Sequence, residues 1–227
     1  MTRRLLLTGA LMLNVFLCAG AEAHGPPDAV PGTYGDAMRW YKRAAEAGHA
    51  KAQFYLGLMY ERGINVEQDA AKAASWFEKA AKQGHTQAQF KLALLYHHGV
   101  GVRKNPAEAA RWYRAAGEAG LARAQYNLGL LLDDGEGVAQ DRAEAATLYR
   151  KAAKAGVPEA QHNLGVLYAN GEGVPRDDIE AYMWLELAAA NGIEQARGFR
   201  DELAKRMGAE AIAEAQRRAR AFAPEGE

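Results

Sequence analysis

Few side chains in this sequence are suited to catalysis. Ser75 is the only serine, and Trp76-Phe77-Glu78 follows it, so the chain lacks the Ser-x-x-Lys spacing with which one class of serine enzymes forms an acyl intermediate. Cys18 is the only cysteine, which excludes a disulfide framework and a zinc cluster built on thiolates. We therefore predict no catalytic residue and expect the protein not to be an enzyme.

The histidines raise the question of a metal site. His97 and His98 are neighbours near an expected helix end, where adjacent side chains point about 100° apart and do not easily share one ion. His49 and His85 occupy the same position of a repeat described below, as expected of a surface position. The acidic stretch 133–137 lacks the ligand series of a calcium loop. No metal and no cofactor are predicted.

The composition is that of a globular protein. The chain has 227 residues, of which 49% are hydrophobic, and its 28 Lys and Arg residues balance 28 Asp and Glu residues. Such a chain is too apolar to be disordered and too evenly charged to bind nucleic acid through a general basic surface. We expect no nucleic-acid partner.

Residues 1–23 are predicted to be a secretory signal peptide. Arg3 and Arg4 form a positive segment, 5–17 is apolar, and Ala21-Glu22-Ala23 has the pattern of a cleavage site. The apolar part is shorter than the roughly 18 residues that a membrane span needs, and an uncleaved signal anchor is the alternative. Cleavage removes the only cysteine, so we expect a thiol-free periplasmic or secreted bacterial protein with no membrane insertion after cleavage.

The strongest signal is a repeat of 36 residues. Its most regular positions hold glycine, alanine, glutamine, leucine and tryptophan. They are Gly48, Gly84, Gly120, Gly156 and Gly192; Ala52, Ala88, Ala124, Ala160 and Ala196; Gln53, Gln89, Gln125 and Gln161; Leu56, Leu92, Leu128 and Leu164; and Trp40, Trp76, Trp112 and Trp184. A fixed period of this length is typical of a protein whose units pack only against their neighbours.

Each unit is predicted to form two helices. In the third unit, Ala124, Leu128 and Leu132 recur every four residues within 122–134, which indicates a helix with one apolar face. The second helix is expected to begin after Asp141, whose carboxylate can cap free backbone N–H groups. Equivalent caps are Asp69, Asn105 and Asp177.

Glycines have two expected roles in this pattern. Gly120 and its equivalents should end the second helices in the left-handed conformation. Gly57, Gly129 and Gly165 lie inside the first helices, where a glycine lowers helix stability by about 1 kcal/mol, so they should allow the paired helix to approach closely.

The full pattern, A-x-x-G-x-x-x-A-Q-x-x-L-G-x-x-Y-x-x-G-x-G-V-x-x-D-x-x-x-A-x-x-W-Y-x-x-A, resembles the Sel-one-like repeat, a relative of the tetratricopeptide repeat. Ile64-Asn65 breaks the G-x-G of the first unit. The resemblance implies an all-α fold, a right-handed superhelical solenoid of helical hairpins. Residues 24–44 would be an N-terminal linker and half-repeat cap. Four repeats would follow at 45–80, 81–116, 117–152 and 153–188, and 189–227 would hold C-terminal capping helices and a tail.

The resemblance also implies that the first helix of each hairpin lines a concave groove that binds a protein or peptide. The residues expected to contact the partner are Phe54, Tyr55, Phe90, Lys91, Leu94, Tyr126, Asn127, Leu130, His162 and Asn163. Four of them, at positions 54, 90, 126 and 162, should form a ladder of flat side chains, and the two asparagines can pair with a peptide backbone. The alternative is that the ladder packs between successive repeats.

The function implied is that of an exported interaction module or adaptor in cell-envelope regulation or assembly. Its partner would be the periplasmic domain of a membrane sensor or an envelope-assembly component. A peptidoglycan-associated scaffold is the alternative. A penicillin-binding or β-lactamase-like activity, attributed to some secreted members of the family, is not supported by the residues around Ser75.

Overall fold

The computed structural model describes residues 34–224. Within them the chain forms eleven α-helices and no β-strand, which confirms the predicted all-α fold. The helices are α1 (Tyr34–Glu46), α2 (Ala50–Arg62), α3 (Ala70–Lys82), α4 (Thr86–His98), α5 (Pro106–Glu118), α6 (Ala122–Asp134), α7 (Arg142–Lys154), α8 (Pro158–Asn170), α9 (Asp178–Ala190), α10 (Glu194–Ala204) and α11 (Ala209–Ala221). The predicted signal peptide lies outside the described residues.

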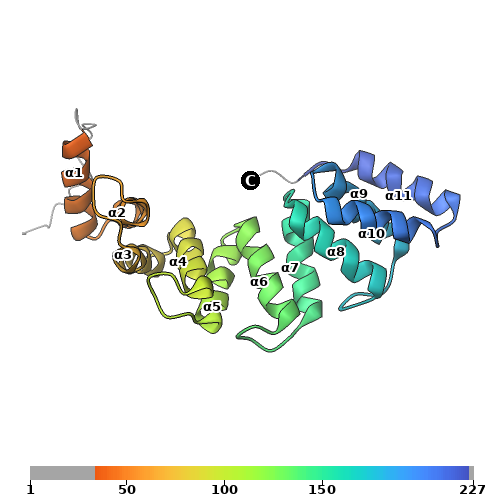
Figure 1. Cartoon of the computed structure of the whole chain (residues 1–227), viewed down its shortest axis with the longest axis horizontal. Helices are drawn as coiled ribbons and strands as arrows, with labels where there is room; N and C mark the ends of the chain where they lie inside the picture. The colour runs from red at the N-terminus through yellow and green to blue at the C-terminus, as the bar shows by residue number, and fades with distance from the viewer. Residues whose placement is uncertain (1–33, 225–227) are drawn as a thin grey trace, which may run out of the picture. The chain divides into compact units, whose positions relative to one another are not determined.

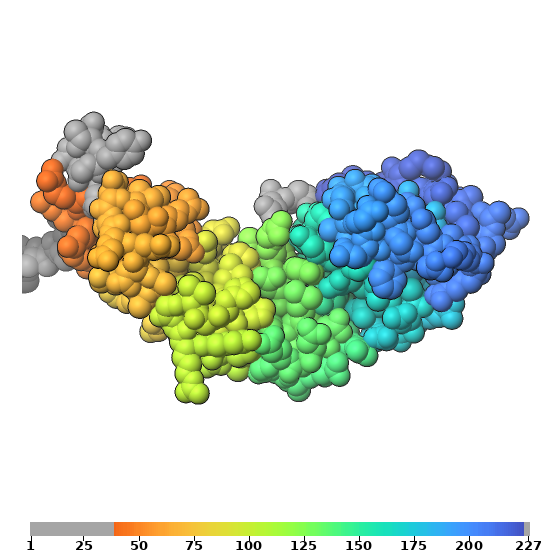
Figure 2. Space-filling view, in the orientation of Figure 1, coloured from red at the N-terminus to blue at the C-terminus, as the bar shows by residue number. Residues whose placement is uncertain are grey.

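The helices pack in chain order as a solenoid of hairpins (Figure 1). The hairpins are α2–α3, α4–α5, α6–α7 and α8–α9, and the second helix of each also contacts the first helix of the next. At the C-terminal end, α10 and α11 both pack against α9. Each segment of the chain covers its own band of surface in Figure 2, as expected when every repeat contacts only its neighbours.

The second helices begin at the predicted caps. The side chains of Asp69, Asn105, Asp141 and Asp177 accept hydrogen bonds from backbone N–H groups in the first turns of α3, α5, α7 and α9. The distances are 2.9 Å for Asp69 and 3.2 Å for Asn105. Each cap satisfies an N–H group that has no partner within the helix.

A glycine inside a first helix allows close helix packing, as predicted. A Cβ atom at Gly129 of α6 would lie 2.6 Å from the ring of Tyr149 on α7, and one at Gly57 would meet Phe77 at the same distance. Phe77, Tyr113 and Tyr149 are completely buried and form the centre of their hairpins. Because no Cβ intervenes at Gly57 and Gly129, the rings of Phe77 and Tyr149 rest directly on the backbone of the first helix.

The glycine loop of each later unit packs on the preceding one. A Cβ atom at Gly173 would lie 2.3 Å from the carbonyl oxygen of Arg142, at the start of α7. Gly173 also has a φ of +68°. The equivalent residue of the first unit, Asn65, keeps the left-handed conformation with a φ of +57°, which asparagine tolerates better than most residues.

The repeated glutamines cap the ends of second helices, a role that the sequence pattern did not reveal. The Nε2 of Gln161 donates a hydrogen bond of 3.2 Å to the carbonyl oxygen of Ala153 near the end of α7. Gln53, Gln89 and Gln125 donate in the same way to the carbonyl eight residues earlier. Gln161 is only 1% exposed, so its hydrogen bonds offset the cost of burying an amide.

Candidate partner-binding face

All ten predicted contact residues lie on the first helices α2, α4, α6 and α8. None is fully buried; nine are half-buried and Tyr55 is 37% exposed. They fall into three rows at the repeat spacing: a ladder row beginning at Phe54, a second row beginning at Tyr55, and an aliphatic row beginning at Leu58. We call the three rows together the first-helix face.

Three members of the ladder row pack against the second helix of their own hairpin. The ring of Phe54 lies 5.8 Å from that of Phe77 on α3, measured between centroids. Phe90 and Tyr126 each lie 5.9 Å from the tyrosine of their own second helix, Tyr113 and Tyr149. These three partner rings lie on the same hairpin, and two further ring contacts of the ladder, described next, cross to the following unit as the packing alternative expected. Each ladder ring keeps part of its surface accessible.

His162, the fourth member of the ladder, has a different neighbour. Its ring meets the edge of Phe199 on α10 at 5.5 Å. Its Nδ1 atom is buried and has no hydrogen-bond partner among the described residues. Burial lowers the pKa of His162, so the neutral ring is favoured.

His85 links the ladder to the next unit. Its ring stacks on Phe54 with centroids 4.6 Å apart, and its Nδ1 accepts a hydrogen bond of 3.3 Å from the N–H of Ala88, which caps α4. Burial lowers the pKa of His85, and the charge of Lys51 lowers it further. The expectation that His85 is an ordinary surface residue was wrong, because the ring is half-buried and caps a helix.

The polar members of the second row have partners inside the protein. The Nζ of Lys91 lies 2.9 Å from a carboxylate oxygen of Glu61 on α2. Asn127 lies beside the hydroxyl of Tyr113 and Asn163 beside that of Tyr149, and each amide acts to lower the pKa of its tyrosine. Each contact connects one hairpin to the next. These residues therefore hold the repeats together, and a peptide backbone would have to compete for the two asparagines.

The two buried tyrosine hydroxyls make a second contact with the preceding first helix. The hydroxyl of Tyr113 lies 3.3 Å from Nδ1 of His97, and that of Tyr149 donates to Oδ2 of Asp133 at 3.4 Å. Burial raises the pKa of Tyr113 to about 12 and raises that of Tyr149 as well. Both hydroxyls thus remain protonated and able to donate at neutral pH.

Apolar side chains occupy the rest of the face. Leu58, Leu94, Leu130 and Val166 form the aliphatic row, and all four are half-buried against the core. Tyr55 packs on Tyr41 of α1 with ring centroids 5.3 Å apart. Phe199, 49% exposed, occupies the corresponding second-row position on α10. Phe199 was not among the predicted contact residues, although it lies one repeat period after Asn163 and that spacing could have identified it.

The histidine pair does not diverge as the sequence suggested. The rings of His97 and His98 stack with centroids 4.9 Å apart and planes 10° from parallel. His97 lies 3.5 Å from Glu136 of the next unit. Across the side chains of residues 39–224, no group of three or more His, Cys, Asp and Glu is placed to hold a metal ion. Nor does any helix in that range have the length and apolar character to cross a bilayer.

Comparison with known proteins agrees with this architecture. The family model of the Sel1 repeat matches residues 24–49, 50–85, 86–121, 122–157 and 158–193, so that each complete unit begins with a first helix. No match was found among curated proteins.

Two solved structures are similar over most of the chain. A Sel1 repeat protein from Oxalobacter formigenes is 37% identical, with 85% of this chain and 81% of that chain covered and a TM-score of 0.71. The protein c5321, described as a protective antigen of uropathogenic Escherichia coli with an SLR fold, is 30% identical with a TM-score of 0.54. That match covers 85% of this chain, which spans about half (49%) of c5321.

The solenoid of hairpins, the period and the glycine loop all coincide with the matched repeats. Sel1 repeats and related tetratricopeptide-like repeats form scaffolds for protein–protein interaction, and this fold is generally not enzymatic. The chain belongs to the Sel1-repeat family.

Proposed function

We propose that the protein is an exported interaction module that binds a protein or peptide along its first-helix face. The observation that supports this most directly is the pair of apolar rows on four consecutive first helices, the ladder and the aliphatic row. Both rows remain partly exposed although they contact the core. A partly exposed apolar stripe that repeats along a solenoid suits an extended or helical segment of a partner.

The contacts within the protein indicate which rows are available to a partner. Lys91, Asn127 and Asn163 are engaged in contacts between hairpins, so recognition falls mainly to the apolar rows and to the exposed rings of Tyr55 and Phe199. In protein interfaces a few well-buried side chains, often aromatic, carry most of the binding energy.

Export is supported by the predicted signal peptide at 1–23 and by the similarity to c5321, because a protective antigen must be accessible to the host's immune system. A periplasmic or secreted location makes the periplasmic domain of a membrane sensor, or a component of envelope assembly, a suitable partner. A peptidoglycan-associated scaffold is the second candidate.

No catalytic function is proposed. Ser75 is exposed on α3, and the cation nearest in sequence after it, Lys79, lies over the ring of Trp76 with Nζ 3.8 Å from the ring centroid. Serine acylation needs a base held beside the hydroxyl. A lysine committed to the neighbouring tryptophan does not meet that requirement.

Site-specific photo-cross-linking in the bacterium that produces the protein tests the proposed function. A cross-linking amino acid is placed at Leu94 on the first-helix face or, as the control, at Thr147, which is exposed on α7. We expect a discrete cross-linked product from Leu94 and none from Thr147, with mass spectrometry identifying an envelope protein. Peptidoglycan fragments would favour the scaffold. Equal cross-linking from both positions would contradict the assignment of the face, and an intact Met1 on the soluble protein would contradict export.

A further inference from the structure

Two cations flank an exposed aromatic ring on α2. Lys51, Tyr55 and Arg62 lie four and seven residues apart, so at 100° per residue they project from one side of the helix. All three side chains are at least partly exposed. We call these three residues the α2 patch.

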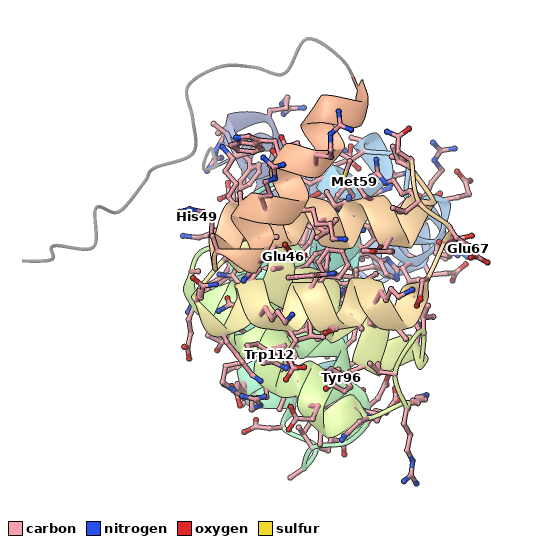
Figure 3. The ribbon with its side chains drawn as sticks, turned by 90° about the vertical axis from the view of Figure 1, so that its left-hand side faces the viewer. Glu46, His49, Met59, Glu67, Tyr96 and Trp112 are labelled. Atoms are coloured by element: carbon pink, nitrogen blue, oxygen red, sulfur yellow. The ribbon has the colours of Figure 1, made fainter. Side chains whose placement is uncertain are left out.

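The two cations lie near opposite ends of α2. In Figure 3, His49, just before Lys51, and Glu67, in the loop after Arg62, appear at opposite edges of the ribbon. With a rise of 1.5 Å per residue, Lys51 and Arg62 are roughly 16 Å apart along the helix axis. An extended chain covers that length in about five residues.

Neither cation is neutralised by the described part of the protein. Among the side chains of residues 39–224, no carboxylate forms an ion pair with Lys51 or Arg62, whereas Lys91 on the next first helix is bound to Glu61 at 2.9 Å. Exposed lysines and arginines elsewhere are commonly paired, as Arg114 is with Glu144 and Arg142 with Glu172. The α2 patch therefore presents two free positive charges.

The positive charge is specific to the first unit. The positions of Lys51 and Arg62 become glutamine and histidine on α4, arginine and aspartate on α6, and glutamate and asparagine on α8. The residues are Gln87 and His98, Arg123 and Asp134, and Glu159 and Asn170. These two positions, beside the first-helix face, are thus both positive on α2 and carry no positive charge on α8.

The ring of Tyr55 lies between the two cations and packs on other aromatic rings. Tyr55 contacts Tyr41 and Phe54, with ring centroids 5.3 and 5.7 Å away, and Phe54 stacks on His85. An apolar side chain placed on Tyr55 would bury exposed ring surface, and carboxylates on either side of it would meet the cations.

We propose that the α2 patch docks an acidic peptide segment of the partner, with an apolar side chain on Tyr55 and carboxylates about five residues apart on Lys51 and Arg62. This inference rests on the proposed function and names the partner chemistry at one end of the face.

Peptide selection on the purified protein tests the proposal. A display library of random peptides about twelve residues long is selected against the wild-type chain, and the enriched peptides are measured on two variants. Lys51→Glu with Arg62→Glu reverses the α2 patch. Arg103→Glu with Lys151→Glu makes the same change of charge in the α4–α5 loop and on α7, where no ion pair among the side chains of residues 39–224 involves either residue. Circular dichroism confirms that both variants fold.

We expect enriched peptides that carry acidic residues around an aromatic or aliphatic one. Their affinity should fall about tenfold or more on the reversed patch and change less than about twofold on the control, and rising salt should weaken it. Basic or uncharged peptides, equal binding to the reversed patch, or no enrichment at all would overturn the proposal.

Failure of the acidic-peptide proposal can be distinguished from failure of the proposed binding function. Peptides that ignore the α2 patch but lose affinity for Leu94→Glu would leave the first-helix face as the binding surface and remove only the acidic specificity. If no peptide is enriched, photo-cross-linking from Leu94 still decides whether the face contacts a partner.

Discussion

Tyr113 and Tyr149 show how a single side chain joins two hairpins. Each ring fills the centre of its own hairpin, while its hydroxyl reaches the first helix of that hairpin and of the next. The sequence shows that these tyrosines recur at the repeat spacing. It does not show that Asn127 and Asn163 lie beside them, because that contact depends on how successive hairpins pack.

The ladder histidine makes stability depend on pH. The folded-state pKa of His162 is lowered by burial, so the unfolded chain binds the proton more readily. The stabilising contribution is complete above the unfolded pKa of about 6.5 and is lost as the pH falls below it toward the folded pKa. The pKa values of His85 and His97 shift in the same direction.

We expect the free energy of unfolding to decrease as the pH falls from about 7.5 to about 5.5, and to decrease less in His162→Tyr. Tyrosine is the matched replacement because Tyr126 occupies the equivalent position on α6. Denaturant titrations across this pH range measure both slopes. Identical slopes in the two proteins would show that His162 titrates alike in the folded and unfolded chains.

Substitutions at two glycines distinguish the cost of a left-handed backbone from the cost of a steric overlap. Gly120 has a φ of +92° and no atom within 4 Å of the position that a Cβ would take, whereas a Cβ at Gly173 would overlap the Arg142 carbonyl. Gly120→Ala should therefore lower stability by about 1–2 kcal/mol, the cost of the left-handed conformation. Gly173→Ala should add an overlap cost of about 1–3 kcal/mol. Thermal melting of both variants tests this, and equal losses would contradict the close approach at Gly173.

At the scale of elements, the sequence predicts the helices well because their signals are local. Residues 122–134 were expected to be helical and form α6, and the predicted caps begin all four second helices. The C-terminal region is different. Its pattern diverges after Ala196, so the contact of α11 with α9 did not follow from the repeat.

The caps make a direct prediction about hairpin stability. The carboxylate of Asp141 accepts the N–H of Glu144 at 2.9 Å, so Asp141→Ala should lower the free energy of unfolding by about 1 kcal/mol. Asp141→Asn should have little effect, since Asn105 caps α5 in the same way. Denaturant unfolding of the two variants provides the comparison, and an equal loss in both would indicate that the charge matters rather than the cap.

At the scale of the whole molecule, the solenoid presents the same rows on successive hairpins, and their chemistry changes along the chain. The repeat period predicts which positions share a row. It does not predict how exposed they are or whether their polar groups are already paired. Exposure and pairing depend on contacts between neighbouring hairpins, such as that of Lys91 with Glu61. Because the polar side chains of the second row are engaged in such contacts, we expect the ladder row and the aliphatic row to make most of the contact with a partner.

The central claim is that the first-helix face, and not the second-helix side, binds the partner. Partner capture by Leu130→Glu, compared with Thr147→Glu on α7, tests it most directly. Glutamate is a matched change because Glu202 occupies the position of Leu130 on α10. With helicity and melting temperature measured on the same samples, we expect Leu130→Glu to remain folded and lose at least about tenfold in capture, while Thr147→Glu binds normally. Normal capture by folded Leu130→Glu, or equal loss in both variants, would contradict the account.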